Sequence, residues 1–252
     1  MNRRRPLVVA HRGGSPADIE NSLAAFEHAL AIGAHLLECD LRLSRDGVIV
    51  LLHDERLDTS PISSFSLAEL RARVPSLLTL DELLDRVARN QTGGRFTFDL
   101  KQRGIERELA PLLRERGLTQ HTLVTTQHAP SLRRLARSFP GLRRGLSRGH
   151  AAAGVRPGWL RRPATALLRP FIFAWLLPQL RWSRATAIAL HYRLVTPTLV
   201  RRFNRAGIRV YTWTVDDCAN AQRLAACGVD LLATNVPREM LECLGWTPPR
   251  RD

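Results

Sequence analysis

The chain has 252 residues, 44% of them apolar, which suits one large α/β barrel better than a small domain. Its formal net charge is +15, and Lys101 is the only lysine. We interpret the basic charge as dispersed, and no base-reading motif accompanies it, so nucleic-acid binding is not expected. Phosphorylated substrates and anionic lipid surfaces are compatible partners.

The cysteines are far apart and form no C-x-x-C pair, which predicts reduced packing thiols in a cytoplasmic protein. They are Cys39, Cys218, Cys227 and Cys243. The opening "MNRRRPLVVAHRGG" has too short an apolar run for a signal peptide. No apolar run has the length of a transmembrane helix.

Short apolar runs alternate with amphipathic stretches along the whole chain, which predicts a sheet of parallel strands with helical crossovers. The strand candidates are 7–11, 35–41, 48–53, 96–101, 121–126, 143–147, 186–191, 209–215 and 229–235. The helix candidates are 22–32, 79–88, 105–116, 129–137, 197–206 and 217–226. The chain is interpreted as one domain over 1–252.

One connection, "RLSRDG", is too short for a parallel crossover, so 35–41 and 48–53 are predicted to form a hairpin. Asp46-Gly47 is a strong turn signal. Removing this arm leaves eight parallel strands, which predicts a (β/α)8 TIM barrel with a β-hairpin extension after strand 2. A two-residue loop would set Asp40 opposite His53, and Glu38 would share the face of Asp40.

Ionisable side chains gather where the early strands end, at the end of a barrel that carries active sites. Each of them alone has an ordinary structural explanation, such as a packed histidine or an ion-paired rim. Together they indicate a site. They are His11, Arg12, Glu20, Glu38, Asp40, His53, Asp54, Asp99 and Lys101.

The residue types in this set point to phosphodiester cleavage. Three carboxylates without a thiolate suit a hard divalent cation, Mg²⁺ or Ca²⁺. Two histidines suit general acid–base catalysis, with the assignment of acid and base left open. Arg12 and Lys101 offer positive charge for an anion. Asp54 is expected to orient His53.

The chain resembles the glycerophosphodiester phosphodiesterases, a family of phospholipase-C-like barrel enzymes. The resemblance lies in "AHRGG", "IENSLAAFEHALAIGAHLLECDLRLSRDGVIVLLHDERL", "LLTLDELL", "FTFDLK", "VYTWTVDD" and "GVDLLATNVP". It implies metal-dependent hydrolysis of glycerophosphodiesters to glycerol 3-phosphate and an alcohol, and some relatives act on lysophospholipids.

The resemblance also implies roles for individual residues. His11 and His53 would be the acid–base pair, and Arg12, Lys101 and Trp213 would contact the substrate. The metal ligands would be Glu38, Asp40 and Asp99, with Glu20 as a further ligand. Asp99 stands where the family usually has Glu, and "TN" at 234–235 stands where it generally has Thr-Asp.

The segment 155–184 is basic and aromatic and is the part least like the family. Its prolines are expected to break it into short helices at best. The functional interpretation is an interfacial segment or lid that makes peripheral membrane contact. The structural alternative is a helix and loop that pack on the barrel.

Three other functions stay open at this point. One is a lysophospholipase-D-like hydrolase at a membrane surface. Another is a non-catalytic barrel that binds phospholipid headgroups or another anion. Nucleic-acid binding ranks last.

Overall fold

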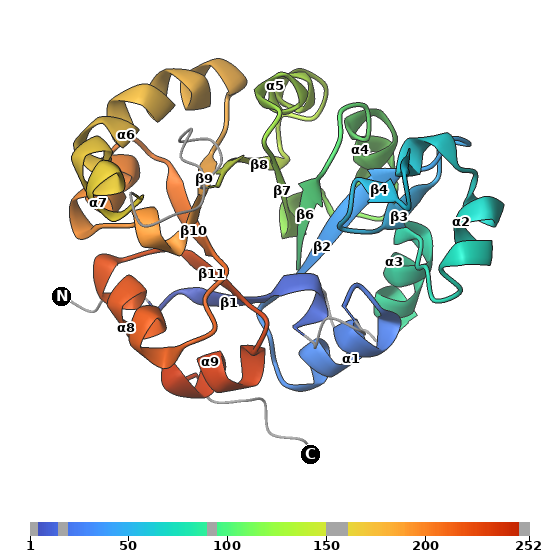
Figure 1. Ribbon diagram of the computed structural model, residues 1–252, viewed down its shortest axis with the longest axis horizontal. Coiled ribbons are helices and arrows are strands. Elements are labelled where there is room, and N and C mark those ends of the chain that lie inside the picture. The colour runs from blue at the N-terminus through green and yellow to red at the C-terminus, as the bar shows by residue number, and fades with distance from the viewer. Residues whose placement is uncertain (1–4, 15–19, 90–94, 150–160, 247–252) are drawn as a thin grey trace.

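The computed structural model describes residues 5–14, 20–89, 95–149 and 161–246, and its centre is a closed barrel of eight parallel strands (Figure 1). The barrel strands are β1 (Leu7–Ala10), β2 (Leu36–Leu43), β6 (Phe96–Leu100), β7 (Thr122–Thr126), β8 (Arg143–Arg148), β9 (Ala187–His191), β10 (Arg209–Trp213) and β11 (Leu231–Thr234). The first strand pairs with both β2 and β11, which closes the cylinder. The predicted fold class is therefore confirmed.

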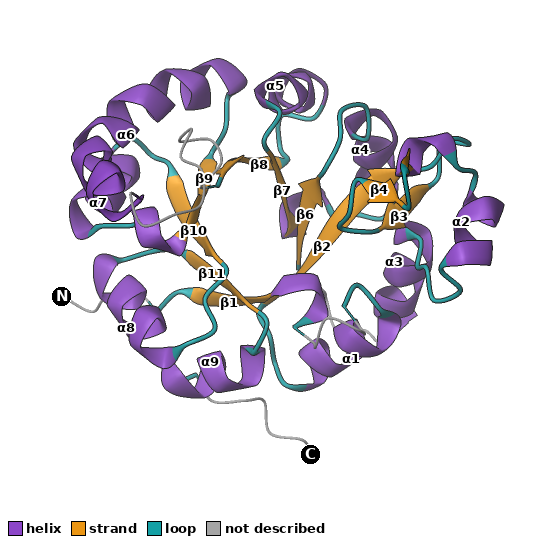
Figure 2. Cartoon of the chain, in the orientation of Figure 1, coloured by secondary structure: helices purple, strands orange, loops and turns teal. Residues whose placement is uncertain are grey.

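Helices surround the barrel (Figure 2). They are α1 (Leu23–Ala31), α2 (Leu67–Arg73), α3 (Leu80–Arg89), α4 (Glu106–Glu115), α5 (Ala129–Ser138), α6 (Arg161–Ser183), α7 (Pro197–Arg205), α8 (Cys218–Cys227) and α9 (Pro237–Cys243). Side-chain caps start several of them where the sequence predicts. The Ser22 hydroxyl accepts from the amide of Ala25, and Asp217 accepts from that of Asn220.

The apolar core has a layer inside the barrel and a layer between strands and helices. Val9, Tyr211 and Ala233 lie in the inner layer. Phe26 and Leu109 illustrate the outer layer, where α1 and α4 bury their apolar faces. Such packing fixes the strand ends from which the polar residues project.

The hairpin after β2 forms, but its predicted register is wrong by one residue. Its second arm, β3 (Ile49–Leu51), pairs Leu41 with Leu51, and the amide of Leu52 donates to the carbonyl of Asp40. The amide of Ser44 donates to the carbonyl of Val48, so the loop holds three residues, Arg45 to Gly47, instead of the predicted two. Gly47 has a φ of 81°. Such a three-residue loop with a left-handed glycine is a common hairpin closure. Asp40 thus faces Leu52 rather than His53.

Two short strands, β4 (Arg56–Leu57) and β5 (Ser60–Pro61), and the helices α2 and α9 were not predicted. The expectation of short helices over 155–184 was also wrong. Residues 155–160 lie outside the described part, and Arg161–Ser183 forms the single helix α6, which contains Pro163, Pro170 and Pro178. Proline removes one backbone donor, and burial of Leu176 and Leu180 in the core stabilises the helix despite that loss.

The prediction of four reduced cysteines was wrong for two of them. Cys218 and Cys243 form a disulfide that joins α8 to α9, whereas Cys39 and Cys227 are free and buried. The two sulfurs are 25 residues apart in the chain, and adjacent packing of the two helices brings them together. Spacing alone could not show that contact. In the described residues, no helix has the length and apolar character needed to cross a membrane.

Candidate functional site

The site begins directly after β1, in the short helical turn His11–Gly13. Arg12 has a φ of 52°, and Gly13 and Gly14 also have positive φ. A Cβ atom on Gly13 would lie 2.6 Å from Cβ of Ala25, and one on Gly14 would lie 2.5 Å from Pro237. The two glycines are therefore required for a tight turn packed against α1 and α9, and this turn places His11 and Arg12 at the barrel end.

The neighbouring strands β2 and β6 carry the carboxylates. Glu38 and Asp40 alternate with apolar residues on β2, and Asp40 lies opposite Asp99 of β6 in the strand register. Because alternate residues of a strand share a face, Glu38 and Asp40 project to the same side. Both are buried, Asp40 completely.

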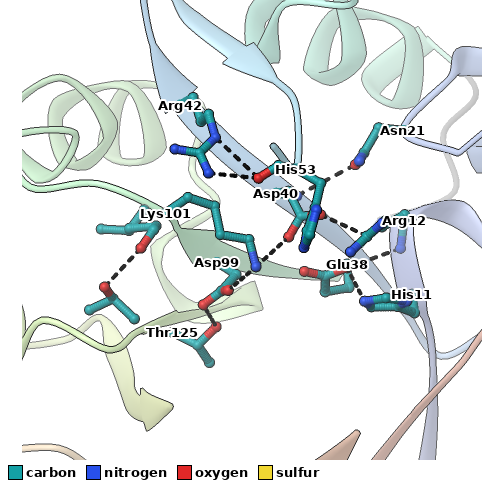
Figure 3. A network of polar contacts seen from close by, with 12 residues as sticks. His11, Arg12, Asn21, Glu38, Asp40, Arg42, His53, Asp99, Lys101 and Thr125 are labelled. Carbon is teal, nitrogen blue, oxygen red and sulfur yellow. Dashed lines mark hydrogen bonds and ion pairs between the residues drawn. The ribbon is translucent and has the colours of Figure 1, made fainter. Parts of the chain in front are cut away.

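Asp40 is held by two cations (Figure 3). Nζ of Lys101 lies 2.8 Å from Oδ1 of Asp40, and Nε of Arg12 lies 2.8 Å from Oδ2. Burial alone would raise the pKa of Asp40, but Lys101 and Arg12 hold it below the usual value. Asp40 is therefore an ionised carboxylate between two cationic side chains.

Lys101 and Arg12 each contact a second carboxylate. Nζ of Lys101 lies 2.5 Å from Oδ2 of Asp99, whose Oδ1 accepts from the Thr125 hydroxyl at 2.7 Å. The carboxylates outweigh burial and raise the pKa of Lys101 above its usual value. A guanidinium nitrogen of Arg12 lies 2.6 Å from Oε1 of Glu20.

Glu38 is the carboxylate with the least compensation. Its Oε2 accepts from the backbone amide of Arg12 at 3.0 Å and lies 3.9 Å from Nε2 of His11. Burial, followed by the charge of Asp40, raises the pKa of Glu38 well above the usual value. A buried carboxyl in this state would bind a cation or a proton.

His11 is oriented by residues that the sequence did not single out. Its Nδ1 lies 2.8 Å from Oδ1 of Asn235, and Asn235 donates from its side-chain and backbone nitrogens to the two oxygens of Asp216, each at 2.8 Å. These bonds direct Oδ1 of Asn235 toward the imidazole, so Nδ1 of His11 carries the proton and Nε2 faces Glu38. Burial lowers the pKa of His11. The available signal was "TN" at 234–235, which stands out from the family pattern.

His53 enters the site from the hairpin arm. Its carbonyl accepts two bonds from Arg42, at 3.1 and 2.7 Å, which fix the backbone above β2. Its Nδ1 lies 2.9 Å from Oδ1 of Asp54, in agreement with the predicted orienting role of Asp54. The His53 side chain is 43% exposed and points toward the carboxylates of β2 in Figure 3.

Trp213 lies at the end of β10, and its ring meets that of His191 edge-on, with centroids 5.6 Å apart. Hydrogen bonds and ion pairs join most of the predicted site residues into one network: His11, Arg12, Glu20, Glu38, Asp40, Asp99 and Lys101. In the described residues no three His, Cys, Asp or Glu side chains are arranged as a metal site. Arg12 and Lys101 ion-pair with carboxylates of the set instead.

Comparison with known proteins identifies the family. The model of the glycerophosphoryl diester phosphodiesterase family matches residues 11–134 and 158–239. A glycerophosphodiester phosphodiesterase of Caldanaerobacter subterraneus is 26% identical over 94% of this chain and 97% of its own length. The probable glycerophosphodiester phosphodiesterase 1 of Mycobacterium tuberculosis is 31% identical over 92% of this chain and 90% of its own.

Solved structures share the fold. An Oleispira antarctica phosphodiesterase, in complex with the product sn-glycerol-3-phosphate, superposes with a TM-score of 0.75 at 23% identity, over 96% of this chain and 97% of that one. The family match covers the residues of the polar network, from His11 to Lys101, and the last barrel strand, β11. The chain belongs to the glycerophosphoryl diester phosphodiesterase family.

Proposed function

We propose that this chain hydrolyses glycerophosphodiesters to glycerol 3-phosphate and an alcohol at the site around Glu38 and Asp40. Membership of the family makes a phosphoric diester hydrolase the expected class of enzyme. The observation that carries the proposal is the buried network at the carboxyl end of the strands. It joins an oriented histidine, two cations and four carboxylates, which is the combination that general acid–base chemistry on an anionic substrate needs.

The proposal includes a divalent cation, Mg²⁺ or Ca²⁺. The donor set fits a hard ion in chemistry, since Glu20, Glu38, Asp40 and Asp99 offer only oxygen atoms. Glu38 in particular is buried with a raised pKa, so a cation beside it would stabilise its ionised form. When bound, such an ion would polarise a phosphate oxygen. Asp40 and Asp99 are shared with Lys101 in the structure, so their part as ligands requires that ion pairs rearrange.

Positive charge for the phosphate would come from Arg12 and Lys101. Both form an ion pair with Asp40, and both have further N–H groups that could donate to a bound anion. Arg12 presents a planar fork, and Lys101 supplies a compact point charge. As charge develops on the phosphate oxygens, these two side chains would stabilise it.

The tautomer of His11 supports a division of labour between the histidines. Because Asn235 accepts from Nδ1, Nε2 of His11 is free to take a proton from the nucleophile, either water or a neighbouring hydroxyl of the substrate. The P–O bond to the alcohol breaks as the new P–O bond forms. Where the substrate hydroxyl attacks, water then opens the resulting cyclic phosphate to give glycerol 3-phosphate. His53, whose Nδ1 contacts the Asp54 carboxylate, would give its Nε2 proton to the departing oxygen.

A lysophospholipid substrate is the second candidate. The observation that favours it is the set of exposed aromatic rings on α6, which would suit a substrate held in a lipid surface. A non-catalytic anion-binding barrel has no comparable support, because anion binding alone does not need an oriented histidine beside a buried carboxyl.

The test is a substrate panel of glycerophosphocholine, glycerophosphoethanolamine and lysophosphatidylcholine, each run with Mg²⁺, Ca²⁺ and a chelator. We expect turnover of at least one substrate with a metal and its loss on chelation. His11→Ala and His53→Ala should each lower kcat by roughly 10²–10⁴-fold. His121→Ala, at an exposed histidine away from the site, is the matched control. Near-normal turnover in both site variants would contradict the roles of the histidines.

A further inference from the structure

The positive charge of the chain is concentrated in one segment, which corrects the expectation that it is dispersed. Residues 116–215 contain 18 arginines and no Asp or Glu, whereas the other 152 residues contain 20 basic and 23 acidic side chains. The whole net charge of the protein therefore comes from this continuous stretch.

The segment forms one flank of the barrel. Its helices are α5, α6 and α7, which are neighbours around the barrel in Figure 1, and α6 contacts both of the others. Arginines on these helices and at their ends are exposed to solvent. They are Arg134, Arg137, Arg181, Arg184, Arg201, Arg202 and Arg205. This flank of the molecule is strongly cationic.

An apolar stripe runs along the outward face of α6, in the middle of the cationic flank. The exposed large apolar side chains in the described residues are Phe171, Trp175 and Trp182, with relative exposures of 67%, 53% and 48%. Ala174 and Pro178 are exposed between them. The spacing of these positions places them on one helical face.

The opposite face of α6 already packs on the barrel. Leu176 and Leu180 are at most 1% exposed and belong to the core shared with α7. The outer aromatic side chains are thus additional to what the fold needs. The amphipathic pattern expected of a surface helix would put polar residues there.

We infer that the outward face of α6, with the arginines around it, binds an anionic phospholipid surface. Aromatic side chains suit the boundary between headgroups and acyl chains, and arginines suit anionic headgroups. At Trp182 the two features are joined, because the guanidinium of Arg133 lies 4.8 Å from the centre of the ring and also donates to the Trp182 carbonyl.

Charge argues against the other occupants of this face. A second copy of the chain would bring two cationic flanks together, which electrostatic repulsion opposes. A nucleic acid would satisfy the arginines, but it would leave the apolar stripe of Phe171, Trp175 and Pro178 without a matching surface on a convex helix. An anionic bilayer matches both the charge and the apolar stripe.

The cationic segment also reaches the carboxyl end of the barrel, where the polar network lies. The strand β8 ends at Arg148, and a Cβ on the next residue, Gly149, would lie 3.1 Å from the ring of Trp213. The described residues that follow β8 therefore end next to Trp213, a predicted substrate contact. None of the residues of the α6 stripe belongs to the polar network, so membrane binding and hydrolysis can be measured separately.

The test is flotation of the full chain with vesicles of phosphatidylcholine alone or with about one-third phosphatidylglycerol, at low and high salt. We expect binding to the anionic vesicles that weakens as salt rises. Phe171→Ala/Trp175→Ala should weaken it by roughly tenfold or more. Arg201→Glu/Arg205→Glu should also weaken it, whereas the control Arg107→Glu/Arg238→Glu, outside the cationic flank, should bind more like the wild type.

Hydrolysis of soluble glycerophosphocholine and the circular dichroism spectrum should be unchanged in the Phe171→Ala/Trp175→Ala variant, which shows that it folds. Absence of vesicle binding by the wild type at low salt overturns the proposal. Self-association or binding of a single-stranded oligonucleotide in place of vesicle binding would do the same. Equal binding by the aromatic variant and the wild type also overturns it.

Discussion

Oδ1 of Asn235 lies 2.8 Å from Nδ1 of His11, although 224 residues separate the two in the chain. The contact exists because β1 and β11 are neighbours in the closed barrel and each residue directly follows its strand. Asp216 holds the Asn235 amide from the other side. Asn235 is thus a positioning residue that acts through His11.

Loss of this contact should slow catalysis more than it weakens substrate binding. In Asn235→Ala the imidazole of His11 loses its fixed tautomer and orientation, so we expect kcat to fall roughly 10–100-fold with a smaller change in KM. Steady-state kinetics against the exposed control Asn204→Ala checks this. A kcat within about twofold of the wild type would show that His11 needs no such support.

Lys101 should stabilise the fold as well as the site. Replacement by Met leaves the buried carboxylate of Asp40 with Arg12 as its remaining ion-pair partner, and we expect a loss of about 3 kcal/mol in the free energy of unfolding. Urea denaturation at neutral pH measures it. The control Arg116→Met removes exposed pairs with Asp81 and Asp85 and should cost less than about 1 kcal/mol. Equal losses in the two variants would contradict the importance of the buried pair.

The disulfide between α8 and α9 should contribute to stability. The disulfide closes a loop of 25 residues, which restricts the unfolded chain and should stabilise the folded state by about 3 kcal/mol. We expect Cys218→Ala/Cys243→Ala to unfold at lower urea than the wild type, and a reductant to shift the wild type but not the double variant. A wild-type transition that does not respond to reductant would count against the bond.

The imidazole of His35 should make stability depend on pH. Its Nδ1 accepts from the amide of Val8 at 3.1 Å, and burial, followed by the charge of Arg95, lowers its pKa. The folded state therefore binds this proton less readily than the unfolded state. The contribution of neutral His35 to the free energy of unfolding is complete above the unfolded-state pKa, near 6.5, and it is lost as the pH falls below that value.

Melting temperatures between pH 7.5 and 5 test this dependence. Replacement of His35 by Asn keeps a hydrogen-bond acceptor but removes the titrating ring. The difference in melting temperature between wild type and variant should therefore change most across this pH range. A difference that is constant with pH would show that His35 does not protonate differently on folding.

Local signals in the sequence were sufficient for the barrel and for most of the polar network. The alternation of strands and helices and the short link after Leu41 predicted eight parallel strands and a hairpin. Since carboxyl ends of parallel strands meet at one edge, residues as distant as His11 and Lys101 were expected together, and the network joins them. The metal ligands and catalytic roles stay predictions.

The details that sequence could not supply depend on small conformational choices or on packing. One extra residue in the turn at Gly47 moved the register, because Asp-Gly suits loops of more than one length. The ion pairs of Arg12 with Asp40 and Glu20 were likewise not predicted, and its contact with the substrate phosphate stays a prediction. The disulfide depended on how α8 packs on α9.

The most direct test of the proposed reaction is ³¹P NMR of glycerophosphocholine incubated with the wild-type protein and Mg²⁺ or Ca²⁺. We predict that the phosphodiester signal is replaced by that of glycerol 3-phosphate, and that Glu38→Gln abolishes the change. Release of phosphocholine instead, or no conversion with either metal, would contradict the proposed reaction.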